Sequence, residues 1–169
     1  MTDRRVKRAV GLAVVAIAAV AAVTAVAAAT PGGNVLVVAD ADTGEHLLTA
    51  PVEEGTPVML NYTHSVEKTP VHDIYRVHNG SLEMTRMEFQ SYGWGLPARE
   101  NVTREGEWFV FDPPGTYEEL YVEPGSVAGH RLRVGDRHYD LVALSDGEGV
   151  RLSIEQRSML TTTLDEFNR

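Results

Sequence analysis

The chain of 169 residues is acidic, with 15 lysine and arginine residues against 24 aspartate and glutamate residues and a formal net charge of -9. It contains no cysteine, which excludes disulfide bonds, thiolate metal sites and cysteine nucleophiles. Binding of nucleic acid or anionic lipid is also not expected, because phosphate contacts need clustered lysine and arginine.

A basic and then apolar N-terminus predicts a membrane anchor or a signal peptide over residues 1–33. Residues 9–29 are uncharged and contain eleven alanines and six valines, and they follow a basic cluster of Arg4, Arg5, Lys7 and Arg8. A helix of this length, at ~1.5 Å rise per residue, can cross ~30 Å of hydrocarbon, and the basic flank favours an outside C-terminal domain. The alanines at 27–29 also resemble a signal cleavage site. We therefore expect either a single-pass cell-membrane protein or a secreted one.

The rest of the chain, residues 34–169, is predicted to be one extracytoplasmic domain with a strongly acidic surface. Four of the basic residues and one of the acidic residues lie before residue 30, so the remainder has 11 basic and 23 acidic residues and a net charge of -12. Lys68 is its only lysine. Dense carboxylates that hold water when salt screens charge are typical of proteins from a high-salt environment.

Short apolar runs separated by turn residues predict an all-β domain, beginning at residues 35–38. In residues 58–64 and 71–77 apolar and polar positions alternate, which predicts two strands that each turn one face to a core. Residues 108–111 are apolar on both faces and suit a central strand. No segment has sustained helical periodicity.

The second half of the domain continues the same pattern. Gly135-Asp136 predicts a hairpin that places Leu132 opposite Tyr139. Residues 113–129 are predicted to form a loop with a short strand at 120–122, and residues 150–155 a strand with one solvent-exposed face. We expect an antiparallel sandwich or partly open barrel of about eight or nine strands.

The hairpin formed by residues 58–64 and 71–77 carries the candidate ligand site. We expect the two strands to pair across the loop 65–70, with His64 opposite Val71 and Tyr62 opposite Asp73. Three polar side chains then share the apolar side of the sheet, where a charge is costly unless it is paired. Ser65 and Lys68 are donors suited to a carboxylate. The predicted ligand-binding residues are Tyr62, His64, Ser65, Glu67, Lys68 and Asp73.

The same residues allow other interpretations. The cluster could simply hold the hairpin together and satisfy the backbone groups of its loop. A metal site would need His64, His72, Asp73 and His78 to converge, but alternation places His72 and His78 on the face opposite His64 and Asp73, so no metal or other cofactor is predicted. Hydrolase chemistry would need Ser65 to reach His64, although neighbours in a strand point to opposite faces, and there is no Gly-x-Ser-x-Gly motif. We therefore do not expect an enzyme.

A second candidate site is the aromatic and glycine-rich stretch from Ser91 to Pro97. Its glycines permit positive φ or close backbone approach. Trp94 either folds over the core or anchors a contact with a partner, as exposed tryptophan often does. The predicted interface residues are Gly93, Trp94 and Gly95.

These two sites together carry a resemblance to a known family. The motif His64-Ser65-Val66-Glu67-Lys68-Thr69-Pro70-Val71, the acid and aromatic at Asp73 and Tyr75, and Gly93-Trp94-Gly95-Leu96-Pro97 resemble the domain-of-unknown-function family 1850. The resemblance covers most of the first half of the domain and is weaker in the hairpin after Val134. Asp73 stands where the family pattern leads us to expect Glu, and Trp94 where a small residue is commoner.

The resemblance implies a small extracytoplasmic protein encoded beside TRAP transporters of the TAXI type, which import organic anions with a soluble binding protein and an ion gradient. On this basis we expect an accessory protein that acts by binding, with the membrane subunit or the binding-protein subunit of such a transporter as its partner. The alternatives are a secreted or cell-surface ligand-binding module and, less favoured, a metal-binding protein.

Overall fold

The structure is a computed structural model that describes residues 31–93, 96 and 101–158. The predicted membrane segment up to residue 30, and Trp94 and Gly95 of the predicted interface, lie outside the described residues. Asn34–Glu155 form one compact unit. Among the described residues, no helix is both long and apolar enough to cross a membrane.

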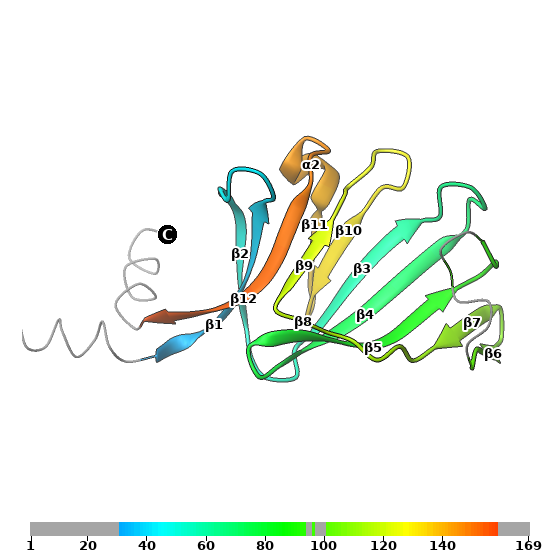
Figure 1. Ribbon diagram of the computed structural model, residues 1–169, viewed down its shortest axis with the longest axis horizontal. Helices are drawn as coiled ribbons and strands as arrows, with labels where there is room; N and C mark the ends of the chain where they lie inside the picture. Colours follow the sequence, from blue (N-terminus) through cyan, green and yellow to red (C-terminus); the bar gives the residue numbers. More distant parts are fainter. Residues whose placement is uncertain (1–30, 94–95, 97–100, 159–169) are drawn as a thin grey trace, which may run out of the picture. The chain divides into compact units, whose positions relative to one another are not determined.

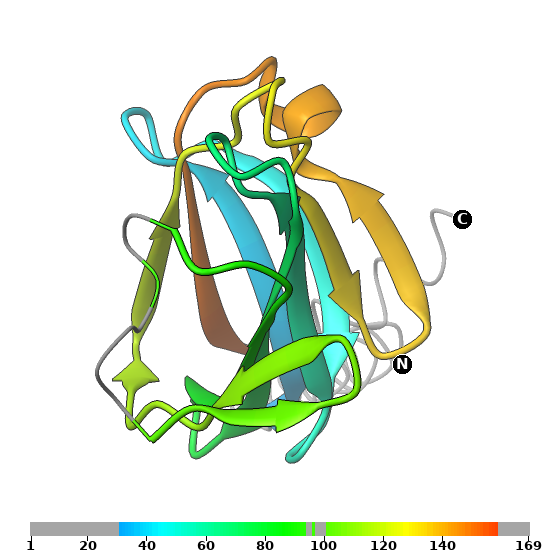
Figure 2. The same cartoon turned by 90° about the vertical axis from the view of Figure 1, so that its right-hand side faces the viewer.

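The described residues form two mostly antiparallel sheets (Figures 1 and 2). The smaller sheet has the strand order β2 (His46–Val52), β1 (Pro31–Asp40), β12 (Val150–Ser158) and β9 (Glu119–Val122). The larger sheet has the order β11 (Arg137–Asp140), β10 (Arg131–Val134), β3 (Pro57–Thr63), β4 (Pro70–His78), β5 (Ser81–Phe89), β7 (Trp108–Phe111) and β6 (Thr103–Glu105), and β8 (Thr116–Tyr117) also pairs with β5. The predicted all-β sandwich is confirmed.

The strands are more numerous than predicted. The described residues contain twelve strands rather than eight or nine, and two of those not predicted, β6 and β8, have only three and two residues. Such short strands contain too few residues for an alternating pattern to stand out. The predicted central strand at residues 108–111 is β7, which pairs with β5 and β6 and is therefore next to the border of the sheet.

The core contains side chains of both sheets, as the alternation predicts. Val58 and Leu60 of β3 are buried, and so are Tyr75 and Val77 of β4, with Leu36 and Leu152 of the smaller sheet in the same apolar cluster. Removing each such side chain from water stabilises the fold by roughly 1.5–3 kcal/mol before entropy is counted. The alternating face of β3 and β4 therefore fixes which side of the larger sheet is the interior.

The predicted hairpin at residue 135 is confirmed, and a short helix that was not predicted follows it. Leu132 lies opposite Tyr139, and Gly135 at the turn has φ of +56°. The chain then enters α2 (Leu141–Ser145), whose N-cap Asp140 accepts a hydrogen bond from the Ala143 amide at 3.1 Å. A helix of five residues is too short to give a helical period in the sequence.

Candidate functional site

The β3–β4 hairpin pairs in a different register from the one predicted. Leu60, and not Tyr62, lies opposite Asp73, and Tyr62 lies opposite Val71. The last pair is Thr63 with Pro70, so the loop is His64–Thr69 and His64 is not a strand residue. Two predicted pairings were therefore wrong. The parity of the pattern is retained, so Tyr62 and Asp73 remain on the same face of the sheet.

Two backbone contacts account for this register. The Thr63 amide donates to the Ala128 carbonyl at 2.8 Å, and this hydrogen bond connects the end of β3 to the segment between β9 and β10. The His64 amide donates to the Thr69 carbonyl, also at 2.8 Å, and closes the loop. Both are backbone contacts to residues outside the two strands. The alternation of apolar and polar side chains is the same in two registers that differ by an even number of residues, so the sequence pattern alone cannot choose between them.

His64 holds the β3–β4 loop from within. It is 8% exposed, and its Nδ1 accepts hydrogen bonds from the Glu67 amide at 3.2 Å and the Val66 amide at 3.4 Å. Its carbonyl accepts from the Lys68 amide at 2.9 Å, and Lys68 has a positive φ of 56°. A ring nitrogen that accepts from two amides carries no proton of its own. These contacts are the ones that the loop-holding interpretation requires, and the ligand-binding prediction for His64 stays a prediction.

The segment after β5 packs directly on this loop. A Cβ added to Gly93 would lie 2.8 Å from both the Cε1 atom of His64 and the Cγ atom of Glu67, which is closer than real Cβ contacts allow. The Ser91 hydroxyl also donates to the Glu67 carboxylate at 3.5 Å. The structure thus brings together residues from the two predicted sites, and glycine at 93 is required by this close approach.

Exposed apolar side chains lie on three segments that contact one another through Ser91 and Glu67 and through Thr63 and Ala128. Val66 on the β3–β4 loop, Tyr92 after β5 and Val127 between β9 and β10 are 66%, 45% and 68% exposed. Ser65, Glu67 and Lys68 are exposed as well. The β3–β4 and β9–β10 connections lie near each other in both views (Figures 1 and 2). We call the set Val66, Glu67, Lys68, Tyr92 and Val127 the loop surface.

Asp73 is a carboxylic acid inside the sandwich. It lies between Leu60 of β3 and Met87 of β5, and its Oδ1 atom is buried without a hydrogen-bond partner. Burial raises the pKa of Asp73 to about 6, while a hydrogen bond with Tyr62 and the charge of His72 lower it by less. The pKa values of the Tyr62 and Tyr75 hydroxyls are raised above the ordinary value for tyrosine, mainly by burial and to a smaller extent by the charge of Asp73.

His130 completes this cluster, and sequence reasoning missed it. Its ring stacks on Tyr62 with centroids 4.9 Å apart and planes 19° apart, and its buried Nδ1 has no hydrogen-bond partner. Burial lowers the pKa of His130. Its position in the sequence could have indicated this, because His130 lies two residues before Leu132 and its side chain is therefore on the same, inward face. We call Tyr62, Asp73 and His130 the inner polar cluster.

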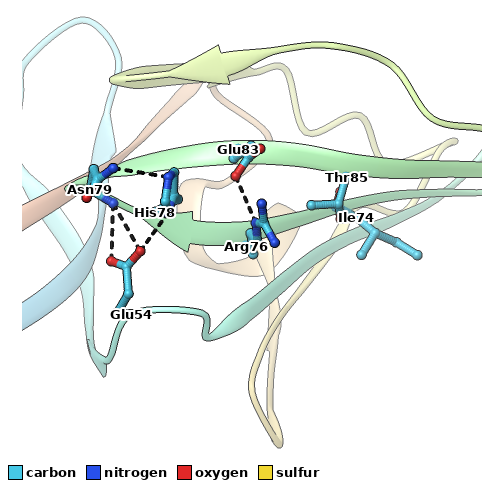
Figure 3. A network of polar contacts seen from close by, with 7 residues as sticks. All are labelled: Glu54, Ile74, Arg76, His78, Asn79, Glu83 and Thr85. Carbon is cyan, nitrogen blue, oxygen red and sulfur yellow. Dashed lines mark hydrogen bonds and ion pairs between the residues drawn. The ribbon is translucent and has the colours of Figure 1, made fainter.

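The other face of β4 carries charges that are paired with neighbours. His72 contacts Glu88 through Nδ1 at 3.2 Å and lies 4.6 Å from the Trp108 ring, measured between centroids. Figure 3 shows further pairs of this region, in which Arg76 donates to Glu83 at 2.8 Å and His78 contacts Glu54 at 2.7 Å. Within the described residues, no group of three or more histidine and acidic side chains could hold a metal ion.

Comparison with known proteins identifies one family. Residues 58–141 match the family described as Domain of unknown function (DUF1850). No curated protein and no solved structure matched the chain. The matched region begins in β3, ends at the first residue of α2, and includes both the inner polar cluster and the packing of Gly93 on His64. This match supports the predicted resemblance to the DUF1850 family over residues 58–141.

Proposed function

We propose that this protein is an extracytoplasmic accessory protein of a TAXI-type TRAP transporter and that it acts by binding, without catalysing a reaction. The association with the transporter rests on the family resemblance, and the extracytoplasmic location rests on the basic and apolar N-terminal sequence. The observation that carries the binding role is the packing of Gly93 on His64 and Glu67. This packing joins two loops into one surface.

The loop surface has the composition of a protein contact. Val66, Tyr92 and Val127 supply exposed apolar area, and Glu67 and Lys68 supply charges of both signs beside Val66. Apolar and aromatic anchors with a polar rim are the usual arrangement of a protein–protein interface. Because His64 already orders the loop, a partner would not have to supply the free energy for ordering it.

Catalysis is not favoured by the same geometry. Nδ1 of His64 accepts two backbone hydrogen bonds, and a general base for Ser65 would need a free ring nitrogen directed at the serine hydroxyl. The residue types of a hydrolase are thus present in the loop, but the Nδ1 atom of His64 is already used by the loop backbone and is not available as a base for Ser65.

Co-purification tests the proposal. The full chain with a C-terminal affinity tag is extracted from cell membranes with a mild detergent in high salt, and we expect the integral membrane subunit of the transporter, identified by mass spectrometry, to be recovered with it. Val66→Asp and Trp94→Ala should each reduce this recovery. Tyr121→Ser is the matched control, because Tyr121 is 61% exposed on β9 of the other sheet. Equal recovery with all four proteins, or no transporter subunit with any of them, would contradict the proposal.

The inner polar cluster favours a second candidate, a secreted or cell-surface module that binds a small ligand. The Oδ1 atom of Asp73 and the Nδ1 atom of His130 are both buried and unpartnered, which is costly unless another molecule supplies the missing hydrogen bonds. Native mass spectrometry of the full chain should then detect a bound mass that is lost in Asp73→Asn and kept in Asp112→Asn. If the unchanged protein shows only the mass of the polypeptide, the small-ligand binding role is excluded.

A further inference from the structure

Several arginines of this acidic protein are ion-paired: Arg76 of β4 with Glu83 at 2.8 Å, Arg86 of β5 with Glu88 at 2.6 Å and with Glu105 at 2.7 Å, and Arg151 of β12 with Glu119. The arginines of the β10–β11 hairpin, which are Arg131, Arg133 and Arg137, form no ion pair within the described part of the chain. Arg104 of β6 also forms no ion pair among the described residues, but its side chain donates to the Gly106 carbonyl at 3.1 Å and lies over the Phe109 ring. Three arginines without an ion pair in one hairpin are unexpected in a chain with a net charge of -9.

Two of these arginines share the outer face of the sheet with a histidine. Leu132 and Val134 are fully buried, so the residues that alternate with them, Arg131 and Arg133, lie on the opposite face. Arg133 is directly opposite His138 of β11. The Nε atom of Arg133 donates to the Gly135 carbonyl at 2.8 Å, which holds its guanidinium in place. We call Arg131, Arg133 and His138 the arginine face.

The carboxylate opposite Arg131 forms no ion pair with it among the described residues. Asp140 lies opposite Arg131, and one of its two carboxylate oxygens, Oδ1, accepts from the Ala143 amide as the N-cap of α2. Arg137 has a separate structural role, because its side chain donates to the Pro51 carbonyl of β2 at 2.6 Å and so links the two sheets. Within the described residues no ion pair occupies Arg131 or Arg133, so the guanidinium groups of both can bind a carboxylate of another molecule.

The arginine face also borders a free strand edge. β11 is the last strand in the order of the larger sheet, and among the described residues its second edge pairs with no other strand (Figure 2). The backbone amides and carbonyls of such an edge can pair with an extended polypeptide. A nucleic acid could use the guanidinium groups but not the edge, and two arginines are few for phosphate binding.

We propose that the β10–β11 hairpin is a docking site for an acidic, extended polypeptide segment of a partner protein. The segment adds a strand beside β11, and its carboxylates pair with the guanidinium groups of Arg131 and Arg133. Guanidinium and carboxylate groups form two parallel hydrogen bonds, which add geometric specificity to the charge attraction. This site is separate from the loop surface, and the proposal does not depend on the transporter association.

A labelled peptide of alternating glutamate and threonine is the probe, and its fluorescence anisotropy is measured with the full chain over a series of salt concentrations. We expect saturable binding that weakens with salt, and binding roughly tenfold weaker in the double variant Arg131→Gln, Arg133→Gln, because two exposed ion pairs are lost. Arg131→Lys, Arg133→Lys should weaken it by less, since the charge is kept and the paired geometry is lost.

The double variant Arg76→Gln, Arg151→Gln is the matched control, because it removes the same charge from arginines that are already paired. Equal weakening in the two glutamine double variants would overturn the proposal, as would equally tight binding of a lysine–threonine peptide or of a single-stranded oligonucleotide. Self-association that disappears in the Arg131, Arg133 variant, measured by analytical ultracentrifugation, would assign the face to a second copy instead. If that variant does not fold, as judged by circular dichroism, the single variant Arg131→Gln at the exposed position carries the test.

Discussion

His64 and Asp73 are two polar residues of one hairpin whose surroundings differ. The Nδ1 atom of His64 accepts hydrogen bonds from two backbone amides, and the residue is almost fully buried. The Oδ1 atom of Asp73 is buried with no partner, between the side chains of two apolar strand residues. A buried polar group stabilises a fold when it is satisfied and destabilises it when it is not.

The difference separates two kinds of candidate residue. His64 is explained by the loop that it organises, so no ligand is needed to account for it. The fold accounts for Asp73 only in part, because Tyr62 hydrogen-bonds to the carboxyl while Oδ1 has no partner, and burial raises its pKa to about 6, which opposes its charge at neutral pH. A residue that weakens the fold in this way is the better candidate for a functional role.

Replacing the buried acid should have the largest effect. The pKa of Asp73 is raised from 3.8 to about 6 in the folded protein. Below pH ~4 the acid is protonated in both the folded and the unfolded state, so it does not lower the free energy of unfolding. Above pH ~6 it is charged in both states, and its destabilising effect is fully present. The stability of the unchanged protein should therefore fall as pH rises from about 4 to about 6, by ~3 kcal/mol from a shift of this size.

Asp73→Asn should remove this fall and raise the free energy of unfolding at pH 7 by up to ~3 kcal/mol. Urea denaturation at a series of pH values measures both effects. Asp112→Asn is the control, because Asp112 is exposed. If Asp73→Asn left the pH dependence unchanged, the buried carboxyl would not be the group that opposes folding.

Gly93→Ala should destabilise the protein by ~1–3 kcal/mol, because the new methyl group would overlap with His64 and Glu67. The histidine ring cannot easily move aside, since its Nδ1 atom is held by two amides. Gly125→Ala is the matched control, since a Cβ at this position would have nothing within 4 Å. The melting temperatures of the two variants are measured by thermal unfolding, followed by circular dichroism. Equal melting temperatures would mean that the β3–β4 loop and the segment after β5 do not pack as described.

His64→Ala should destabilise by ~1–2 kcal/mol, because the Val66 and Glu67 amides lose their acceptor in a loop that water can partly reach. Amide hydrogen exchange at these two residues should become faster. His138→Ala, at an exposed position, is the control. Unchanged exchange at Val66 and Glu67 would show that the loop is ordered without the histidine.

The paired charges on the outer face should be the least sensitive. Glu88 contacts His72 at 3.2 Å and Arg86 at 2.6 Å, and although its partial burial raises its pKa, the hydrogen bonds from Arg86 and His72 bring it below the ordinary value. Glu88→Gln should cost less than ~1 kcal/mol at neutral pH, as is usual for partly exposed pairs. Chemical denaturation measures this, and a loss as large as that of Gly93→Ala would contradict the contrast between the two faces.

The sequence by itself determined the all-β class, the inward faces of β3 and β4, and the hairpin at Gly135, because a two-residue period and a tight turn are local properties of the chain. Tyr62 and Asp73 were correctly assigned to one face for the same reason. The very short strands β6 and β8 and the helix α2 were missed because they contain too few residues to show a period.

Only the tertiary structure decided the register of β3 and β4, the packing of Gly93 on His64, and the entry of His130 into the inner polar cluster. Each depends on segments that are distant in the sequence, such as the contact between Thr63 and Ala128. An alternating pattern states which side a residue faces, but it does not state which residue of another strand or loop lies beside it. That choice is made by hydrogen bonds and packing between distant segments, whose free energy depends on the whole fold.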